Sequence, residues 1–302
     1  MHFGAAEAPA TVLNLIKKAI KAVTPYGIVA LRQRILSDRA SERAGRWQKE
    51  FHSRRKTNIE AATVDRLADH RIVDPLNPAE MVDFLVARGI PRVHVLEGSI
   101  PEKSLSFLNK QLEYRLPIGR PMLGLHIGNF VGVSLAYLTA ALCSRHFESL
   151  VVAVDPNVPH RGIPHPQDHV VALLAATGLQ GHVINIVGYS ATKSVSNDGV
   201  VYDEYDPAQH YSSEASCERV LRNLSGIMHR QFDIALLDGN HEAPYLMEEL
   251  GTLRPLLSPR GIVILDDIDE NWTDIRDVFL RSRSLGFEPL TSDGRIGVIA
   301  IS

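Results

Sequence analysis

From Pro121 to the end of the chain, short apolar runs alternate with segments of helical periodicity, and this alternation limits the fold more than any other feature. The runs "LVVAV" and "IVIL" are apolar at every position, which is typical of parallel strands buried on both faces. Five such strand–helix units are followed by two apolar runs around the turn "SDGR". The pattern predicts an α/β fold in which helices cover both faces of a largely parallel sheet that closes with a hairpin.

The first part of the chain has a different sequence pattern, in which helical segments are joined by basic stretches. The segment "ATVLNLIKKAIKAV" is amphipathic, and "NPAEMVDFLVARGI" predicts a helix with Asn77 as N-cap and Pro78 at its first position. We therefore predict a mainly helical N-terminal region over residues 1–116, suited to oligomerisation or to covering a substrate, and a second domain over residues 117–302. The apolar N-terminal helix favours a homo-oligomer.

Charge and composition exclude several classes of protein. A net charge of −3 argues against a surface that coats nucleic acid, although residues 1–60 hold 12 Lys and Arg against 5 Asp and Glu. That basic stretch is either a solvated contact or lid face or a surface that attracts anionic lipid or an acidic substrate. Two cysteines cannot form a disulfide framework or a zinc cluster, which fits a reducing compartment. With no transmembrane run and no signal peptide recognisable, we predict a cytoplasmic protein.

The loop "HIGNFVGVS" follows the first strand of the alternating region, where open α/β sheets bind ligands. Gly128 and Gly132 permit close backbone approach, but their spacing is not the G-x-G-x-x-G fingerprint of dinucleotide binding. The next strand ends in Asp155, an acid placed to accept hydrogen bonds from a ribose diol. The alternative is a simple turn, because Asp-Pro-Asn is good turn chemistry.

Three further acids follow the fourth and fifth strands. Asp238 closes the fourth strand, and Asp266 and Asp267 close the fifth, so the three carboxylates are expected to converge at one rim without an obvious cationic partner. A hard divalent cation such as Mg²⁺, Ca²⁺ or Mn²⁺ would relieve their repulsion, whereas the alternative is turn formation and helix capping. His241 would overlook the same rim as a proton acceptor, unless it is an ordinary surface histidine.

These motifs resemble the class I S-adenosylmethionine-dependent methyltransferases over residues 117–302. The resemblance implies a Rossmann-like, doubly wound sheet of seven strands whose last strand is antiparallel. It also implies that S-adenosylmethionine is the cofactor. The cofactor-binding residues that it implies are Gly128, Asn129, Gly132, Ser134, Asp155, Tyr189, Ser190 and Asp238. The family often has an acid two residues before the first glycine, where this chain has His126.

The motif "DGNH", followed by a helix and "GIVILDD", is similar to the metal-dependent O-methyltransferases that act on sugar hydroxyls of macrolides and other glycosides. The resemblance implies that Asp238, Asp266 and Asp267 hold a divalent cation, Mg²⁺ in that family, and that His241 is the general base. Catechol-type relatives share the metal acids and have a lysine at the position of His241. The acceptor is thus expected to be a glycoside or related natural product, or alternatively a small catechol-like or polyketide molecule.

The walls of the acceptor site are expected in three segments, residues 98–105, residues 160–169 and the long loop that follows "HVINIVG". That loop has Tyr202, Tyr205, His210 and Tyr211, which suit contacts to sugars, unless it is a disordered excursion. Two other classes remain open, an NAD-dependent oxidoreductase and a non-catalytic binding protein on the same fold. A hydrolase is disfavoured because no G-x-S-x-G motif occurs, and an iron oxygenase because His241 is a single histidine.

Overall fold

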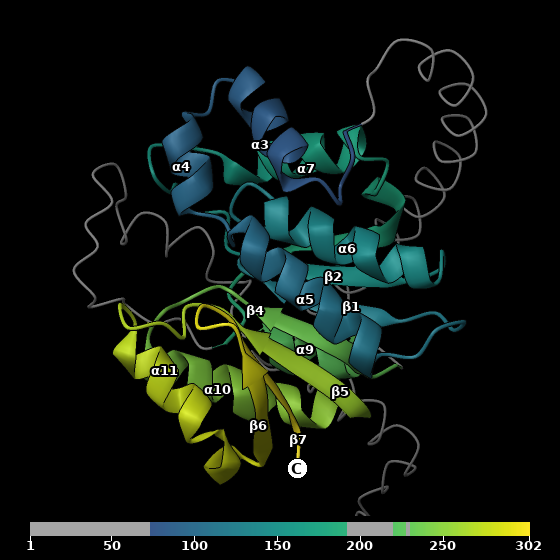
Figure 1. Ribbon diagram of the computed structural model, residues 1–302, viewed down its shortest axis with the longest axis vertical. Helices are drawn as coiled ribbons and strands as arrows, with labels where there is room; N and C mark the ends of the chain where they lie inside the picture. The colour runs from purple at the N-terminus through teal and green to yellow at the C-terminus, as the bar shows by residue number, and fades with distance from the viewer. Residues whose placement is uncertain (1–72, 192–219, 228–229) are drawn as a thin grey trace, which may run out of the picture. The chain divides into compact units, whose positions relative to one another are not determined.

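Seven strands form one sheet in the order β3-β2-β1-β4-β5-β7-β6, as Figure 1 shows for most of its length. Strands β1 to β5 run parallel to one another, and β7 is antiparallel to both β5 and β6. This arrangement confirms the predicted Rossmann-like sheet with an antiparallel last strand. The strands are β1 (Leu123–Ile127), β2 (Leu150–Asp155), β3 (Val183–Val187), β4 (Phe232–Leu237), β5 (Leu257–Leu265), β6 (Phe287–Ser292) and β7 (Gly297–Ile301).

The computed structural model describes residues 73–191, 220–227 and 230–302. Residues 71–302 form a single unit by their contacts. The predictions for the basic N-terminal stretch and for most of the long loop after β3, including its three tyrosines, fall outside the described residues. The division at residue 117 therefore stays a prediction.

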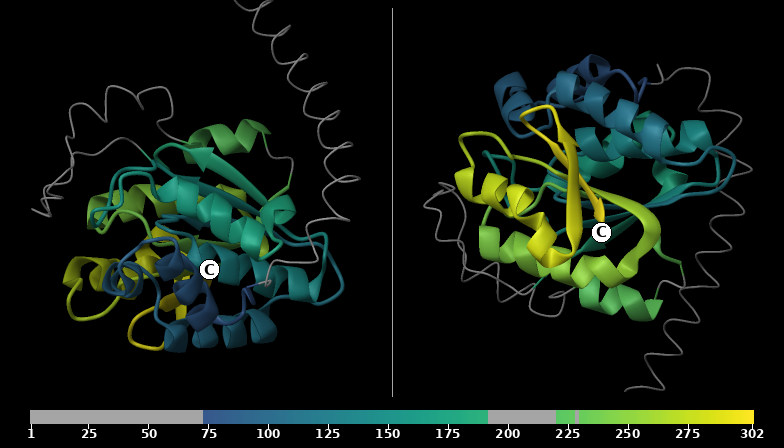
Figure 2. Two further views of the ribbon diagram at one scale, coloured as in Figure 1. Left: turned by 90° about the horizontal axis from the view of Figure 1, so that it is seen from above. Right: turned by 60° about the horizontal axis from the view of Figure 1, so that its bottom comes forward.

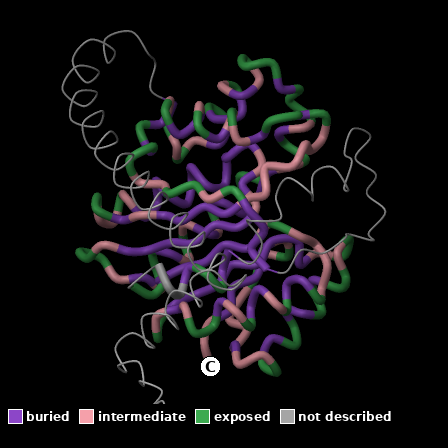
Figure 3. Tube along the Cα trace, turned by 180° about the vertical axis from the view of Figure 1, so that it is seen from behind, coloured by how far each residue is buried: buried purple, intermediate pink, exposed green. Residues whose placement is uncertain are grey.

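Helices cover both faces of the sheet, and the two faces bury separate apolar clusters. One face is covered by α3 (Pro78–Ala87), α5 (Glu102–Arg115), α6 (Val133–Arg145) and α7 (Pro166–Ala176). The other face is covered by α9 (Val220–Ile227), α10 (Ala243–Leu253) and α11 (Thr273–Leu280). Figure 2 shows the β6–β7 hairpin at the end of the sheet beyond β5, and Figure 3 shows that the central strands are the most completely buried part.

The shorter helices lie between these elements along the chain. They are α4 (Arg92–Glu97), η1 (Gln180–His182), η3 (Arg254–Leu256) and η4 (Ser282–Leu285). The predicted start of α3 is confirmed, because Asn77 is the N-cap, its side chain accepts from the backbone N–H of Glu80, and Pro78 is the first helical residue. Helices α3 and α5 pack against α6, so the described N-terminal helices belong to the same unit as the sheet.

Among the described residues, no helix is both long enough and apolar enough to span a membrane.

Candidate active site

The carboxyl ends of β1, β2, β4 and β5 are aligned by hydrogen bonds that continue just beyond the strands. The N–H of Gly128 donates to Val154 O at 3.0 Å, and the N–H of Asp238 donates to Ile127 O at 2.9 Å. The N–H of Asp266 donates to Leu237 O at 3.0 Å. The glycine loop, Asp238 and Asp266 therefore lie along one edge of the sheet, where open α/β folds bind their ligands.

Gly128 is needed where the loop after β1 passes the loop after β4. Its φ is +83°, in the left-handed region that favours glycine, and a Cβ atom there would lie 1.8 Å from Asp238 O. Gly132 also has a positive φ, +93°, and is the N-cap of α6. Both glycines allow close approach within the chain itself, Gly128 to Asp238 and Gly132 to Val170.

Asp155 lies at the end of β2 and faces Asn129. Its Oδ2 accepts from the N–H of Asn129 at 2.6 Å, and its Oδ1 accepts from the N–H of Asn157 at 2.6 Å. Burial raises the pKa of Asp155, and these backbone donors oppose that shift. Each carboxylate oxygen keeps a second lone pair, so Asp155 can still accept bonds from a bound diol.

The segment after β3 is tied to α10 by a buried polar network. The Ser190 hydroxyl bonds to the carboxyl of Glu249 and lies 3.2 Å from the hydroxyl of Tyr245. The Tyr245 oxygen also accepts from the N–H of Ala191 at 3.3 Å. Burial raises the pKa of Glu249 to about 8, so it is mostly protonated near neutral pH. This network fixes the loop that holds Tyr189 and Ser190, two of the predicted cofactor-binding residues.

A pocket of about 480 Å³ opens at this edge of the sheet, a size that suits a cofactor with a small acceptor. It brings together most of the predicted site residues. Those in its lining are Gly128, Asp155, Tyr189, Ser190, Asp238, His241, Asp266 and Asp267.

Three predicted residues lie outside that lining, namely Asn129, Gly132 and Ser134. Asn129 offers its backbone to Asp155, and Gly132 begins α6. The Ser134 hydroxyl lies 3.0 Å from Nε2 of His126, a histidine whose burial lowers its pKa to about 3. His126 is therefore neutral and fills the space between β1 and α6.

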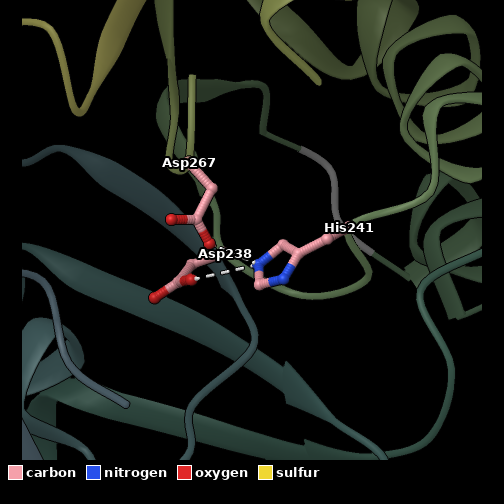
Figure 4. A group of neighbouring side chains, drawn as sticks. All are labelled: Asp238, His241 and Asp267. Atoms are coloured by element: carbon pink, nitrogen blue, oxygen red, sulfur yellow. Dashed lines mark ion pairs between the residues drawn. The ribbon is translucent and has the colours of Figure 1, made fainter. Parts of the chain in front are cut away.

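His241 lies among the acids at the rim of the pocket, and Figure 4 shows its ring turned toward Asp238 and Asp267. Its Nε2 is 2.8 Å from Asp267 Oδ2 and 4.0 Å from Asp238 Oδ1. Burial alone would lower the pKa of His241, but the two carboxylates raise it to about 10. The backbone of Asp267 has φ +56°, a left-handed conformation that is uncommon for aspartate and occurs at functional sites.

Arg295, just before β7, provides a cation that the sequence reasoning missed. Its Nε and Nη2 donate to the two oxygens of Asp266 at 3.0 Å each, and its Nη1 lies 2.6 Å from Asp267 Oδ1. The expectation that these carboxylates lack a cationic partner is therefore wrong. The signal that could have revealed it is the "SDGR" turn, because a hairpin on β5 brings that turn next to the end of β5.

The donors at the rim fit a divalent cation in part. One ligand atom each from Asp238, His241 and Asp267 lie within 4.8 Å of one another, and two carboxylates with an imidazole form a reasonable ligand set. Asp266 is only 1% exposed, and both of its oxygens bond to Arg295. A cation would therefore be held first by Asp238 and Asp267, with Asp266 behind them.

Another part of the pocket lining comes from the end of α4, from Phe130 in the loop after β1 and from the loop after β2. Gly98 packs against the ring of Phe130, and that ring meets His160 edge-on at a centroid distance of 5.1 Å. Arg161 Nη1 lies 2.8 Å from Glu97 Oε2 and ties the two segments together. Both segments expected as walls, residues 98–105 and 160–169, thus contribute to the lining.

Trp272 also lines the pocket, although sequence reasoning did not single it out. Its ring lies against that of His241, with centroids 4.4 Å apart and planes inclined by 54°. Its only sequence signal was its position in "DDIDENW", a short distance after the two acids.

Residues 125–268 match the model of a family described as a methyltransferase domain. The match spans a little under half of the chain and includes β1 to β5 with the loops that form the site. The match lies within residues 117–302, the range predicted to be a methyltransferase domain. No match was found among curated proteins.

Several solved structures have a similar arrangement of the chain. One is the O-methyltransferase TomG from Streptomyces achromogenes in complex with SAM, at 14% identity over 82% of this chain and 96% of that chain, with a TM-score of 0.49. Another is an O-methyltransferase from Bacillus cereus in complex with SAH, at 15% identity over 80% of this chain and 96% of that chain, with a TM-score of 0.47. A third is CalS11, a TDP-rhamnose 3'-O-methyltransferase, at 13% identity over 74% and 92%, with a TM-score of 0.43. Similarities at this level do not transfer an activity or a substrate.

Proposed function

We propose that this chain transfers a methyl group from S-adenosylmethionine to a hydroxyl of a small acceptor, a glycoside or related natural product. The observation that carries the proposal is the position of His241. It lines the same pocket as Asp155, the proposed ribose acid, and its Nε2 is 2.8 Å from a carboxylate that can orient it. A histidine beside a cofactor pocket and oriented by a carboxylate is suited to removing the proton of a hydroxyl nucleophile.

The cofactor half of the pocket follows the sheet edge. Asp155 would accept hydrogen bonds from the ribose hydroxyls, and the backbone at Gly128 would lie along the amino acid part of the cofactor. Tyr189 and Ser190 would contact the adenine, on a segment that Glu249 and Tyr245 hold in place. Asn129, Gly132 and Ser134 would support the loop from behind, because they do not line the pocket.

The reaction itself needs a deprotonated oxygen aligned with the sulfonium methyl. Because Nε2 faces Asp267, which keeps the ring oriented, His241 would accept the hydroxyl proton at its other ring nitrogen, Nδ1. A base must be neutral before it accepts a proton, and the two carboxylates raise the pKa of His241 only while their own charge faces it. Offsetting that charge lowers the pKa of His241 toward its ordinary value.

A divalent cation, proposed as Mg²⁺, would be held by Asp238 and Asp267, with Asp266 as the third acid. When bound, it would supply Lewis acidity that makes the acceptor hydroxyl a stronger acid. The chain's own contribution is to place two acids and His241 on one side of the pocket. Trp272 and Phe130 give the acceptor flat apolar walls, which suit the face of a sugar or of an aromatic ring.

The cofactor can be tested by calorimetry with S-adenosylhomocysteine and, separately, with NAD. Binding of S-adenosylhomocysteine alone supports the proposal, whereas binding of NAD alone would turn the assignment to the oxidoreductase class. Transfer of a labelled methyl group to a panel of glycosides, catechols and polyketides would then identify the acceptor class. Activity that survives both EDTA and His241→Ala would overturn the proposed mechanism.

A further inference from the structure

Arg295 occupies an unusual place for a basic residue, at the rim where the proposed function puts a divalent cation. Its position is fixed by the hairpin turn rather than by a flexible loop. Asp293 Oδ1 accepts from the N–H of Arg295 at 2.9 Å and from the N–H of Ile296 at 2.8 Å. The Arg295 carbonyl in turn accepts from the N–H of Ile268 at 3.0 Å. The backbone hydrogen bonds of Arg295 to Asp293 and Ile268 therefore fix the position from which its guanidinium reaches the rim.

The guanidinium divides the two adjacent acids into different roles. Asp266 is fully engaged, since both of its oxygens accept from Arg295 in a bidentate pair. Asp267 is shared, since its Oδ1 faces Arg295 at 2.6 Å and its Oδ2 faces His241 at 2.8 Å. Asp267 is therefore the carboxylate that both the guanidinium and a divalent cation would need.

We propose that Arg295 is a built-in counterion that competes with the divalent cation for Asp267 and so weakens the affinity of the rim for metal. The inference rests on the metal site of the proposed function and adds to it a residue that sets the affinity. A guanidinium in contact with a ligand carboxylate repels a divalent cation and occupies part of the charge that would attract it. Two cationic groups around one carboxylate repel each other strongly in a partly buried site. We therefore expect Arg295 to weaken the affinity for the divalent cation by about tenfold or more.

A purely structural role is the competing explanation. Arg295 also lies 3.5 Å from Asp269 and could serve only to fasten the hairpin to the end of β5. In that case its removal would lower the stability of the fold and leave the intrinsic affinity for metal unchanged or reduced. The two explanations thus predict different changes in the affinity for a metal probe.

The test uses Mn²⁺ alone as the probe, with the full chain and no acceptor. Bound and free Mn²⁺ would be measured by electron paramagnetic resonance for the wild type, Arg295→Leu, Arg295→Gln and Arg295→Lys. We expect the two neutral variants to bind Mn²⁺ about tenfold or more tightly than the wild type and Arg295→Lys to stay close to it. Arg295→Gln retains a hydrogen-bond donor for Asp266, so it keeps the test decisive if Arg295→Leu does not fold.

Arg283→Leu is the matched control. Arg283, in η4 just before the hairpin, forms a pair with Glu288 of β6, but its side chain is 71% exposed and lies outside the pocket lining. This variant should bind Mn²⁺ as the wild type does. Equal or weaker binding by a folded neutral variant of Arg295 overturns this inference alone. If the wild type and all variants fail to bind Mn²⁺, the metal site of the proposed function falls together with the inference.

Discussion

The two ends of the pocket neutralise their acids in different ways. At the cofactor end, Asp155 is satisfied by backbone N–H groups of Asn129 and Asn157, which belong to its own turn and to the neighbouring loop. At the acceptor end, Asp266 and Asp267 face side-chain cations, Arg295 and His241. Backbone donors are fixed with the fold, whereas side-chain cations can move or be displaced. We therefore expect the proposed cofactor end to act as a rigid receptor and the proposed acceptor end as a site whose charges can rearrange.

The largest effect should come from removing His241, the proposed general base. For His241→Ala we expect the rate constant for methyl transfer to fall about 10²- to 10⁴-fold, because general-base catalysis of this kind contributes that much. The affinity for S-adenosylhomocysteine should stay within about twofold, since the cofactor end does not depend on His241. Single-turnover transfer and calorimetry would measure the two quantities.

His146→Ala is the matched control, a histidine at the C-cap of α6 and outside the pocket lining. It should leave both quantities unchanged. A His241→Ala rate within twofold of the wild type would mean that another group accepts the proton, and the division between the two ends would then fail.

A second prediction concerns Gly128, where the loop after β1 passes the loop after β4. Gly128→Ala should lower the free energy of unfolding by more than about 2 kcal/mol, because a left-handed backbone disfavours alanine and the Cβ would overlap the backbone of Asp238. Urea denaturation would measure the change. Gly178→Ala is the control, since Gly178 has φ +72° but an added Cβ would meet nothing within 4 Å. If the two variants lose equal stability, the close approach of the two loops is not what requires Gly128.

How far the sequence could predict the site also differs between the two ends. The apolar runs predicted the sheet because parallel strands are buried on both faces, and the acids that follow these runs were placed at the correct edge. The positions of Asp155 and Asp238 could be predicted because each lies at the end of a strand or directly after it. Ser134 was included among the cofactor-binding residues on the family resemblance alone; its hydroxyl lies beside His126 and outside the pocket lining.

The contact between Arg295 and the acids could not be predicted from the sequence in the same way. The proximity of Arg295 to Asp266 depends on the register of an antiparallel pair in which Gly297 is opposite Leu265. That register is decided by side-chain packing across the sheet, which a single sequence does not display. Contacts between residues distant in the chain, such as those of Arg295 with Asp266 and of Glu249 with Ser190, were therefore the part of the site that escaped prediction.

A third prediction concerns Asp155, at the proposed cofactor end of the pocket. Asp155→Asn should weaken binding of S-adenosylhomocysteine about 10- to 100-fold, because hydrogen bonds to a charged group are worth about 1.5–3 kcal/mol. The amide would also present an N–H group to at least one of the two backbone donors that now face the carboxylate. Calorimetry would measure the affinity, and Asp168→Asn, an exposed acid in the first turn of α7, should bind as the wild type does. Unchanged binding by Asp155→Asn would leave Asp155 as a turn residue only.

The smallest expected effect concerns Glu249 of α10, which bonds to Ser190 in the segment proposed to contact the adenine and has no part in the acidic rim. Burial raises its pKa from 4.5 to about 8, so between these values the folded chain holds a proton that the unfolded chain has released. Its contribution to stability is then fully favourable below pH 4.5 and declines as the pH rises toward 8. The decline is at most about 1.4 kcal/mol per pH unit.

Glu249→Gln cannot ionise and keeps an oxygen and a donor for Ser190, so it should remove this decline. Urea unfolding between about pH 5 and pH 8 should show the variant gaining stability relative to the wild type as the pH rises. Glu288→Gln is the control, because Glu288 is paired with Arg283 and its pKa is lowered rather than raised. Parallel stability profiles for Glu249→Gln and the wild type would show that Glu249 is ionised in the folded chain. In that case the cofactor end would also contain a displaceable charge, and the contrast between a rigid and a rearranging end would no longer hold.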